Sequence, residues 1–175
     1  MKRLFLVLPA LAFVLLFTTS SLAQNQRGPS TPQERDTAVK IVRLLETDPF
    51  HKDAKKWREG LLTWLIEVPD IHIEICSAYL GSEKSTDKNY GSEIFGQTMF
   101  SGAAFIIEHP DQANDRVAVK LAGVEGALKV YENVLTTKPK AKSAFLDGLV
   151  AKRNKGELRA YVEESVKEKP RTRAS

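Results

Sequence analysis

Hydrophobic residues recur at intervals of three and four along most of the chain beyond residue 30, which is the spacing of amphipathic α-helices. The first such stripe follows Thr31-Pro32-Gln33-Glu34. This segment is a capping box with proline at the first helical position, so it marks the start of a helix. The stripe predicts that this helix ends near Thr47.

A second helix is expected from Asp48-Pro49 to Val68, because an acceptor side chain followed by proline repeats the start signal. Its apolar face includes Trp57 and Trp64. A tryptophan pair on one helix face can form a platform for a carbohydrate or a quaternary amine. Its regular helical spacing favours a place in the core instead.

The segment from Pro69 to Leu80 fits two patterns, since its isoleucines alternate with polar residues as in a strand but also share a helical face. We expect a helix, because no second convincing strand is present to pair with it. A polar, glycine-containing loop follows from Gly81 to Ser92, and it is a candidate contact surface.

Ile94 to Ile107 is apolar on nearly all sides and is expected to be the central buried helix. The helix after it carries a near-heptad apolar seam of the kind that packs against a partner helix, and this seam also offers a homodimer contact. Gly123 and Gly126 interrupt that helix, which predicts a close approach of a neighbouring helix. The seam consists of Val117, Leu121, Val124, Leu128, Tyr131 and Leu135.

Two shorter helices are expected at Lys140 to Lys152 and at Gly156 to Lys167, with Asn154 and Gly156 between them. The chain is therefore predicted to form an all-α, single-domain helical bundle of about six or seven helices over residues 31–168. Residues 169–175 are expected to be a basic disordered tail.

The first 23 residues have the pattern of a signal peptide: a basic start, an apolar run from Leu4 to Phe17, and small residues at Ser21 and Ala23. The run is too short for a typical membrane span and contains Pro9. Cleavage between Ala23 and Gln24 would leave a short polar linker, residues 24–30, before the helical domain. We therefore expect an exported protein, periplasmic or extracellular, without stable membrane insertion after cleavage.

The cysteine content and the charge distribution limit the classes of function that the chain can have. The 152 residues after residue 23 can bury a core without disulfides, and Cys76, the single cysteine of the chain, cannot form an intramolecular one. Residues 138–175 contain eleven basic and five acidic side chains, a net charge of +6. This part is a candidate for binding an anionic membrane, although solvated helix faces explain such runs more often. Nucleic-acid binding is not expected, because the sequence has neither a dense basic face nor aromatic residues interleaved with basic ones.

The strongest candidate for chemistry is the group His72, Glu74 and Cys76, because these are metal-ligand types at alternating positions. On a strand they would share one face, whereas on a helix they scatter. The His-x-Glu start occurs in zinc deaminases, but those need a further Cys-x-x-Cys that this chain lacks. We therefore expect no metal and no cofactor.

One short stretch resembles a known repeat. The second helix of a tetratricopeptide repeat is matched in residue type and spacing by Ala127, Tyr131, Val134, Leu135 and Pro139. The first-helix pattern is absent upstream, and no 34-residue period recurs. The resemblance, over about a tenth of the chain, implies helix-hairpin packing and a groove for a peptide.

These observations favour a non-enzymatic binding or structural module of the cell envelope, with another envelope protein or a peptide as its partner. Two alternatives stay open. One is a metal-binding protein or hydrolytic enzyme that uses His72, Glu74 and Cys76. The other is a peripheral membrane binder that uses the basic C-terminal part.

Overall fold

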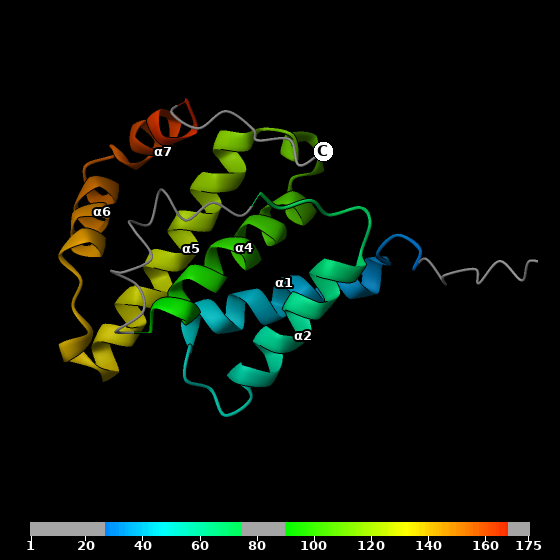
Figure 1. Ribbon diagram of the computed structural model, residues 1–175, viewed down its shortest axis with the longest axis horizontal. Helices are drawn as coiled ribbons and strands as arrows, with labels where there is room; N and C mark the ends of the chain where they lie inside the picture. The colour runs from blue at the N-terminus through cyan, green and yellow to red at the C-terminus, as the bar shows by residue number, and fades with distance from the viewer. Residues whose placement is uncertain (1–26, 75–89, 168–175) are drawn as a thin grey trace, which may run out of the picture.

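The computed structural model describes residues 27–74 and 90–167, and within these ranges it contains six α-helices, two short 3₁₀ helices and no strand (Figure 1). The prediction of an all-α bundle is therefore confirmed. The predicted signal peptide with its cleavage site at Ala23 and Gln24, Cys76 and the predicted basic tail lie outside the described residues. The elements are α1 (Pro32–Thr47), α2 (Ala54–Glu67), α4 (Gly91–Glu108), η2 (Pro110–Gln112), α5 (Arg116–Thr137), η3 (Pro139–Ala141), α6 (Ala144–Asn154) and α7 (Leu158–Lys167).

The centre of the fold is the contact between α4 and α5 (Figure 1). A Cβ atom at Gly123 would lie 2.6 Å from the Thr98 carbonyl oxygen, and one at Gly126 would lie 1.9 Å from Ser101 Oγ. Real Cβ atoms do not approach other atoms so closely, so only glycine allows the two helices to touch here. The close approach predicted from the two glycines is confirmed.

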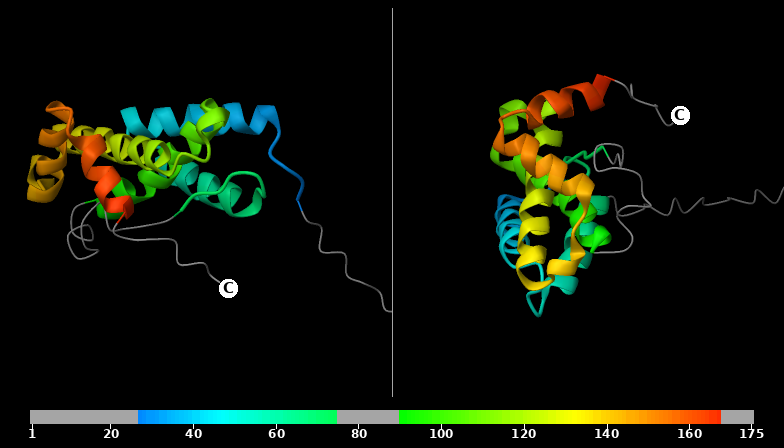
Figure 2. Two further views of the ribbon diagram at one scale, coloured as in Figure 1. Left: turned by 90° about the horizontal axis from the view of Figure 1, so that it is seen from above. Right: turned by 90° about the vertical axis from the view of Figure 1, so that its left-hand side faces the viewer.

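Helices α1 and α2 lie at one end of the molecule, away from α6 and α7 (Figures 1 and 2). The Thr31 capping box starts α1: the Glu34 N–H donates to Thr31 Oγ1 at 3.2 Å, and the Thr31 N–H donates to the Glu34 carboxylate at 2.7 Å. Both helices bury apolar side chains against α4. This cluster consists of Ala38, Val42, Leu45, Ala54, Leu61, Phe100 and Ala104.

Helices α6 and α7 cover the other side of α5 (Figure 2). Three positions of the predicted seam, Val124, Leu128 and Tyr131, are fully buried there. The Tyr131 hydroxyl donates to Asp147 Oδ1 at 2.7 Å and accepts from the Ser143 N–H at 2.9 Å, which fixes the start of α6. These three positions therefore pack within the chain, whereas Val117, Leu121 and Leu135 are only partly buried.

The predicted start of the second helix at Asp48-Pro49 is wrong, because α2 begins at Ala54. Asp48 instead ends α1: its N–H donates to the Leu44 carbonyl at 2.8 Å, and its carboxylate accepts from the Phe50 N–H at 3.2 Å. Proline is common just after a helix end as well as at a helix start. Asp48 and Pro49 therefore fit the end of one helix as well as the start of another.

The helix expected over Pro69 to Leu80 is not formed in the described part, which ends at Glu74. Residues 71–74 have no helical assignment, and burial alternates along them: Ile71 is buried, His72 exposed, Ile73 half-buried and Glu74 exposed. This is the spacing of an extended segment. Apolar packing takes the place of a strand partner, because Ile71 and Ile73 lie against α4. The loop expected up to Ser92 also ends earlier, since α4 begins at Gly91.

A polar clasp fixes the segment before α1 to the end of α2. Asp70 accepts hydrogen bonds from the Ser30 N–H at 2.8 Å, the Ser30 hydroxyl at 2.7 Å and the Arg35 guanidinium at 2.6 Å. Burial raises the pKa of the Asp70 carboxyl, but the bonds from Ser30 and Arg35 outweigh it and lower the pKa from 3.8 to about 2. The clasp is therefore formed by the ionised carboxylate.

We expect the Asp70 clasp to make stability depend on pH in the acid range. Because the folded state holds the lower pKa, the contribution is complete above pH 3.8 and is lost as the pH falls through about 2. Asp70 keeps a fifth of its side-chain surface, so screening limits the contribution to about 1 kcal/mol. Urea unfolding of Asp70→Asn should show this loss at neutral pH and a flatter acid limb. Asp36→Asn, which removes the carboxylate of an exposed ion pair, is the control. Equal acid limbs in wild type and Asp70→Asn would contradict the expectation.

Candidate functional site

The three metal-ligand candidates are only partly covered by the structure. His72 is exposed, Glu74 is bound by two cations, and Cys76 lies outside the described residues. The Glu74 carboxylate accepts from Arg116 Nε at 3.1 Å and Nη2 at 2.9 Å, and it lies 3.2 Å from Lys120 Nζ. Burial raises the Glu74 pKa, but these two cations outweigh it and lower the pKa. In the described ranges, no group of three or more His, Cys, Asp and Glu side chains is placed to hold a metal ion.

The two other histidines have local packing roles. The His51 ring stacks on Trp57 at 4.4 Å between centroids, and its Nδ1 accepts from the Asp53 N–H at 3.2 Å. His51 thus lies in the turn before α2. The His109 ring packs at 4.6 Å against Phe105, where α4 ends.

A cleft of about 570 Å³ opens between α1 and α2. Two apolar side chains of α1, Ala38 and Ile41, face three of α2 across it. Both tryptophans of the chain are among these residues. The full lining is Gln33, Glu34, Thr37, Ala38, Ile41, Lys56, Trp57, Gly60, Leu61 and Trp64.

Trp57 and Trp64 are half-buried, because each packs against the α1–α2–α4 core on one side and lines the cleft on the other. The Trp64 indole N–H is out of contact with solvent and has no hydrogen-bond partner among the described residues. Gly60 lies between the two tryptophans on the same face of α2, and a Cβ atom there would meet no atom of the described residues within 4 Å. A larger residue at position 60 would thus occupy space at the cleft, which is open in this protein.

The charged side chains at the cleft are Glu34 and Lys56. Glu34 is engaged within the chain: its carboxylate accepts from the Thr31 N–H and forms ion pairs with Arg27. The backbone bond from Thr31 is the main cause that lowers the Glu34 pKa, and Arg27 adds to it. Lys56 is exposed and belongs to no ion pair among the described residues. Of the two charged side chains in the lining, Lys56 is therefore the one that no ion pair of the described residues engages.

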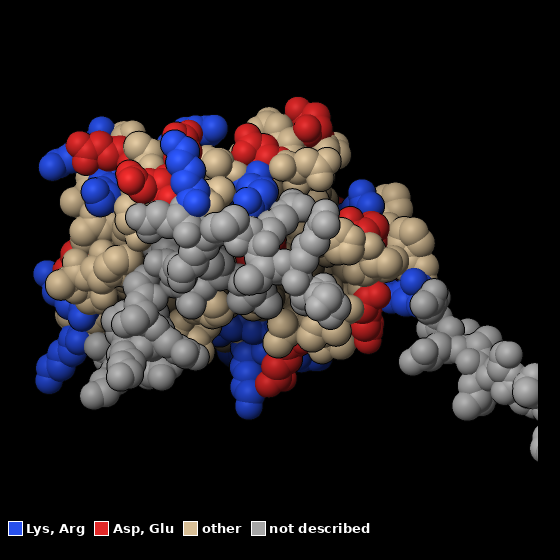
Figure 3. Space-filling model, turned by 45° about the horizontal axis from the view of Figure 1, so that its top comes forward, with Lys and Arg blue, Asp and Glu red and all other residues tan. Residues whose placement is uncertain are grey.

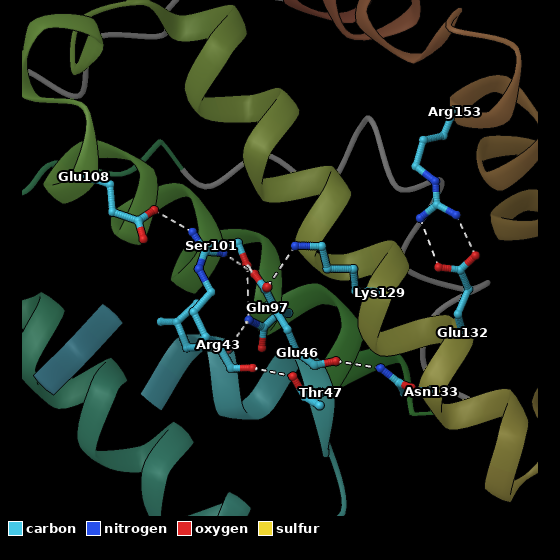
Figure 4. A network of polar contacts seen from close by, with 11 residues as sticks. Arg43, Glu46, Thr47, Gln97, Ser101, Glu108, Lys129, Glu132, Asn133 and Arg153 are labelled. Carbon is cyan, nitrogen blue, oxygen red and sulfur yellow. Dashed lines mark hydrogen bonds and ion pairs between the residues drawn. The ribbon is translucent and has the colours of Figure 1, made fainter. Parts of the chain in front are cut away.

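A second polar cluster lies inside the bundle, where α1, α4 and α5 meet (Figure 4). The buried Glu46 carboxylate accepts from Arg43 at 2.7 Å, Lys129 at 3.0 Å and the Ser101 hydroxyl at 2.8 Å. The amide of Gln97 donates to Ser101 Oγ at 3.1 Å. These bonds join the three helices at their contact, as in a structural network, although the buried Gln97 Oε1 accepts no hydrogen bond from the described residues.

The basic C-terminal part carries exposed lysines at the corner between α5 and α6, namely Lys138, Lys140 and Lys142. Farther along, Arg153 forms a two-bond ion pair with Glu132 of α5. Acidic and basic side chains are interspersed on the face shown in Figure 3. None of the helices in residues 27–74 and 90–167 combines the length and the apolar composition needed to cross a bilayer.

The cleft between α1 and α2 is the site that sequence reasoning missed. The tryptophan pair was predicted to lie in the core, with a binding platform as the alternative, and Gly60, Ile41 and Lys56 were not connected with it. A glycine between two tryptophans on one helix face was the available signal, because it removes the side chain that would fill the space between the helices. Comparisons of the chain with protein-family models, with curated proteins and with solved structures found no match.

Proposed function

We propose that the mature chain is an exported, non-enzymatic binding protein of the cell envelope and that its ligand places an apolar group in the α1–α2 cleft. The observation that carries the proposal is the pair of half-buried tryptophans facing open space beside Gly60. Ligand sites are typically concave, mainly apolar and bordered by a few polar groups. The cleft volume of about 570 Å³ lies within the range of such sites.

Export is supported by the signal-peptide pattern of the first 23 residues. N-terminal sequencing of the protein recovered outside the cytoplasm tests this part of the proposal. A chain that begins at Gln24 is expected. A chain that retains Met1 and fractionates with membranes would contradict it.

We expect Gly60→Phe to abolish the binding of a small apolar probe, octan-1-ol, because Gly60 lines the cleft and a Cβ atom at this position would contact no described atom within 4 Å. Both tryptophans of the chain line the cleft, so intrinsic tryptophan fluorescence reports on its occupancy. Titration of the wild-type chain with octan-1-ol should therefore give a saturable change in emission. The same titration of Gly60→Phe should give none.

Gly148→Phe is the matched control. Gly148 also lies in an α-helix, and a Cβ atom there likewise meets nothing within 4 Å, but it is in α6, away from the cleft. This variant should bind octan-1-ol as the wild type does. Identical titrations of the Gly60→Phe and Gly148→Phe variants, or the lack of a saturable change in the wild type, would contradict the proposed function.

A further inference from the structure

The charge at the cleft gives the chemical class of the ligand, provided that the proposed function holds. Of the two charged side chains in the lining, Glu34 is occupied by Thr31 and Arg27. Lys56 has no ion-pair partner among the described residues. A ligand that enters the cleft therefore meets a lysine that no ion pair within residues 27–74 and 90–167 engages.

The rest of the lining is mainly apolar. Trp57, Leu61 and Trp64 of α2 face Ala38 and Ile41 of α1 across the cleft. Burying apolar surface there is favourable, whereas burying a polar group that finds no hydrogen-bond partner is costly. The complementary ligand is thus an apolar body with one negative end.

We propose that the α1–α2 cleft binds an amphipathic monocarboxylate, an alkyl or aryl chain that packs against Trp57 and Trp64 and places its carboxylate at Lys56. A ligand with an ammonium group would be repelled by Lys56, because like charges at close range oppose binding. The cleft volume matches a small molecule, while a stable protein partner would need an interface of about 1,000 Å² or more. The proposed occupant is therefore a small molecule.

Three probes have similar alkyl chains but differ in the charge of their polar end: octanoate, octan-1-ol and octylamine. Comparing their affinities separates the contribution of charge from that of apolar contact. Binding is followed by tryptophan fluorescence in the full mature chain. Octanoate should bind more tightly than octylamine. In Lys56→Gln, octanoate should bind about threefold more weakly, the size expected for a solvent-exposed ion pair, and octan-1-ol should bind as before.

Lys55→Gln is the matched control, because Lys55 is the neighbouring lysine of α2 and does not line the cleft. Its side chain is 89% exposed, and its Nζ lies 3.9 Å from Glu59 Oε1. This variant should leave all three affinities unchanged. Equal binding of octanoate and octylamine, or an equal effect of the two lysine variants, would overturn the carboxylate inference. In that case, Gly60-dependent binding of octan-1-ol would still support the proposed function. If no probe binds in a Gly60-dependent way, both proposals are wrong.

Discussion

Gly126→Ala is expected to destabilise the protein by about 3 kcal/mol or more, the largest effect that we predict for a single methyl group. The added Cβ would lie 1.9 Å from Ser101 Oγ and 2.5 Å from Ser101 Cβ. The hydroxyl cannot simply rotate away without loss, because it is bonded to Glu46 and Gln97. Helices α4 and α5 must therefore separate, and this disturbs the contact at the centre of the fold.

Urea or thermal unfolding measures this effect, and Gly148→Ala is the control. Alanine is favoured over glycine inside a helix by up to about 1 kcal/mol. At Gly148, where nothing lies within 4 Å, this gain should appear as increased stability. At Gly126 the clash should exceed it. A Gly126→Ala protein as stable as the wild type would show that α4 and α5 are not packed as described.

Glu46→Ala is expected to be the second most damaging change, with a loss of about 2–3 kcal/mol. Only 5% of the Glu46 side-chain surface is exposed, and its carboxylate receives Arg43, Lys129 and Ser101 (Figure 4). Removing one partner of a buried ion pair leaves the others unsatisfied and costs about 3–5 kcal/mol. The loss here is smaller because the side chains of Arg43 and Lys129 keep about half of their surface and can turn to solvent.

The comparison for Glu46 is Asp36→Ala in the same helix. Asp36 pairs with Lys40 at 2.7 Å, but 63% of the Asp36 side chain is exposed. Exposed pairs contribute at most about 1 kcal/mol, so the change in unfolding free energy should be small. A Glu46→Gln variant should lie between the two, because its amide can still accept from Ser101. Equal losses for Glu46→Ala and Asp36→Ala would contradict the buried network.

Local signals in the sequence were sufficient for most of the helices. These signals depend on residues that are close together in the sequence. They are the Thr31 capping box, the break at Gly156 and the apolar length of the central helix. Gly156 has a φ of +75°, the left-handed conformation that glycine adopts readily at a helix end. Gly123 and Gly126 also indicated the close helix contact, since no local feature of α5 explains them.

One error came from a local signal that fits two positions, and the other came from a contact with a distant part of the chain. Asp48-Pro49 suits the end of one helix as well as the start of another, and the turn up to Asp53 settles the matter. Residues 71–74 are extended because α4 offers an apolar surface to Ile71 and Ile73. That surface belongs to residues about thirty positions away.

The cleft was missed for the same reason. The apolar periodicity that places Trp57 and Trp64 toward α1 does not show how far apart the two helices stand. A half-buried tryptophan and a core tryptophan have the same sequence pattern. The space between the helices depends on Gly60 and on the way that α1 and α2 each rest against α4.

The central claim is that the α1–α2 cleft is an open binding site, and NMR of the indole N–H groups tests it most directly. The chain has two tryptophans, and both line the cleft, so the mature protein has two such signals. On titration with octan-1-ol, both signals should shift along one saturation curve in the wild type and in Gly148→Phe, and neither should respond to the probe in Gly60→Phe. Indole signals that stay fixed in the wild type while backbone signals of other helices shift would contradict the account.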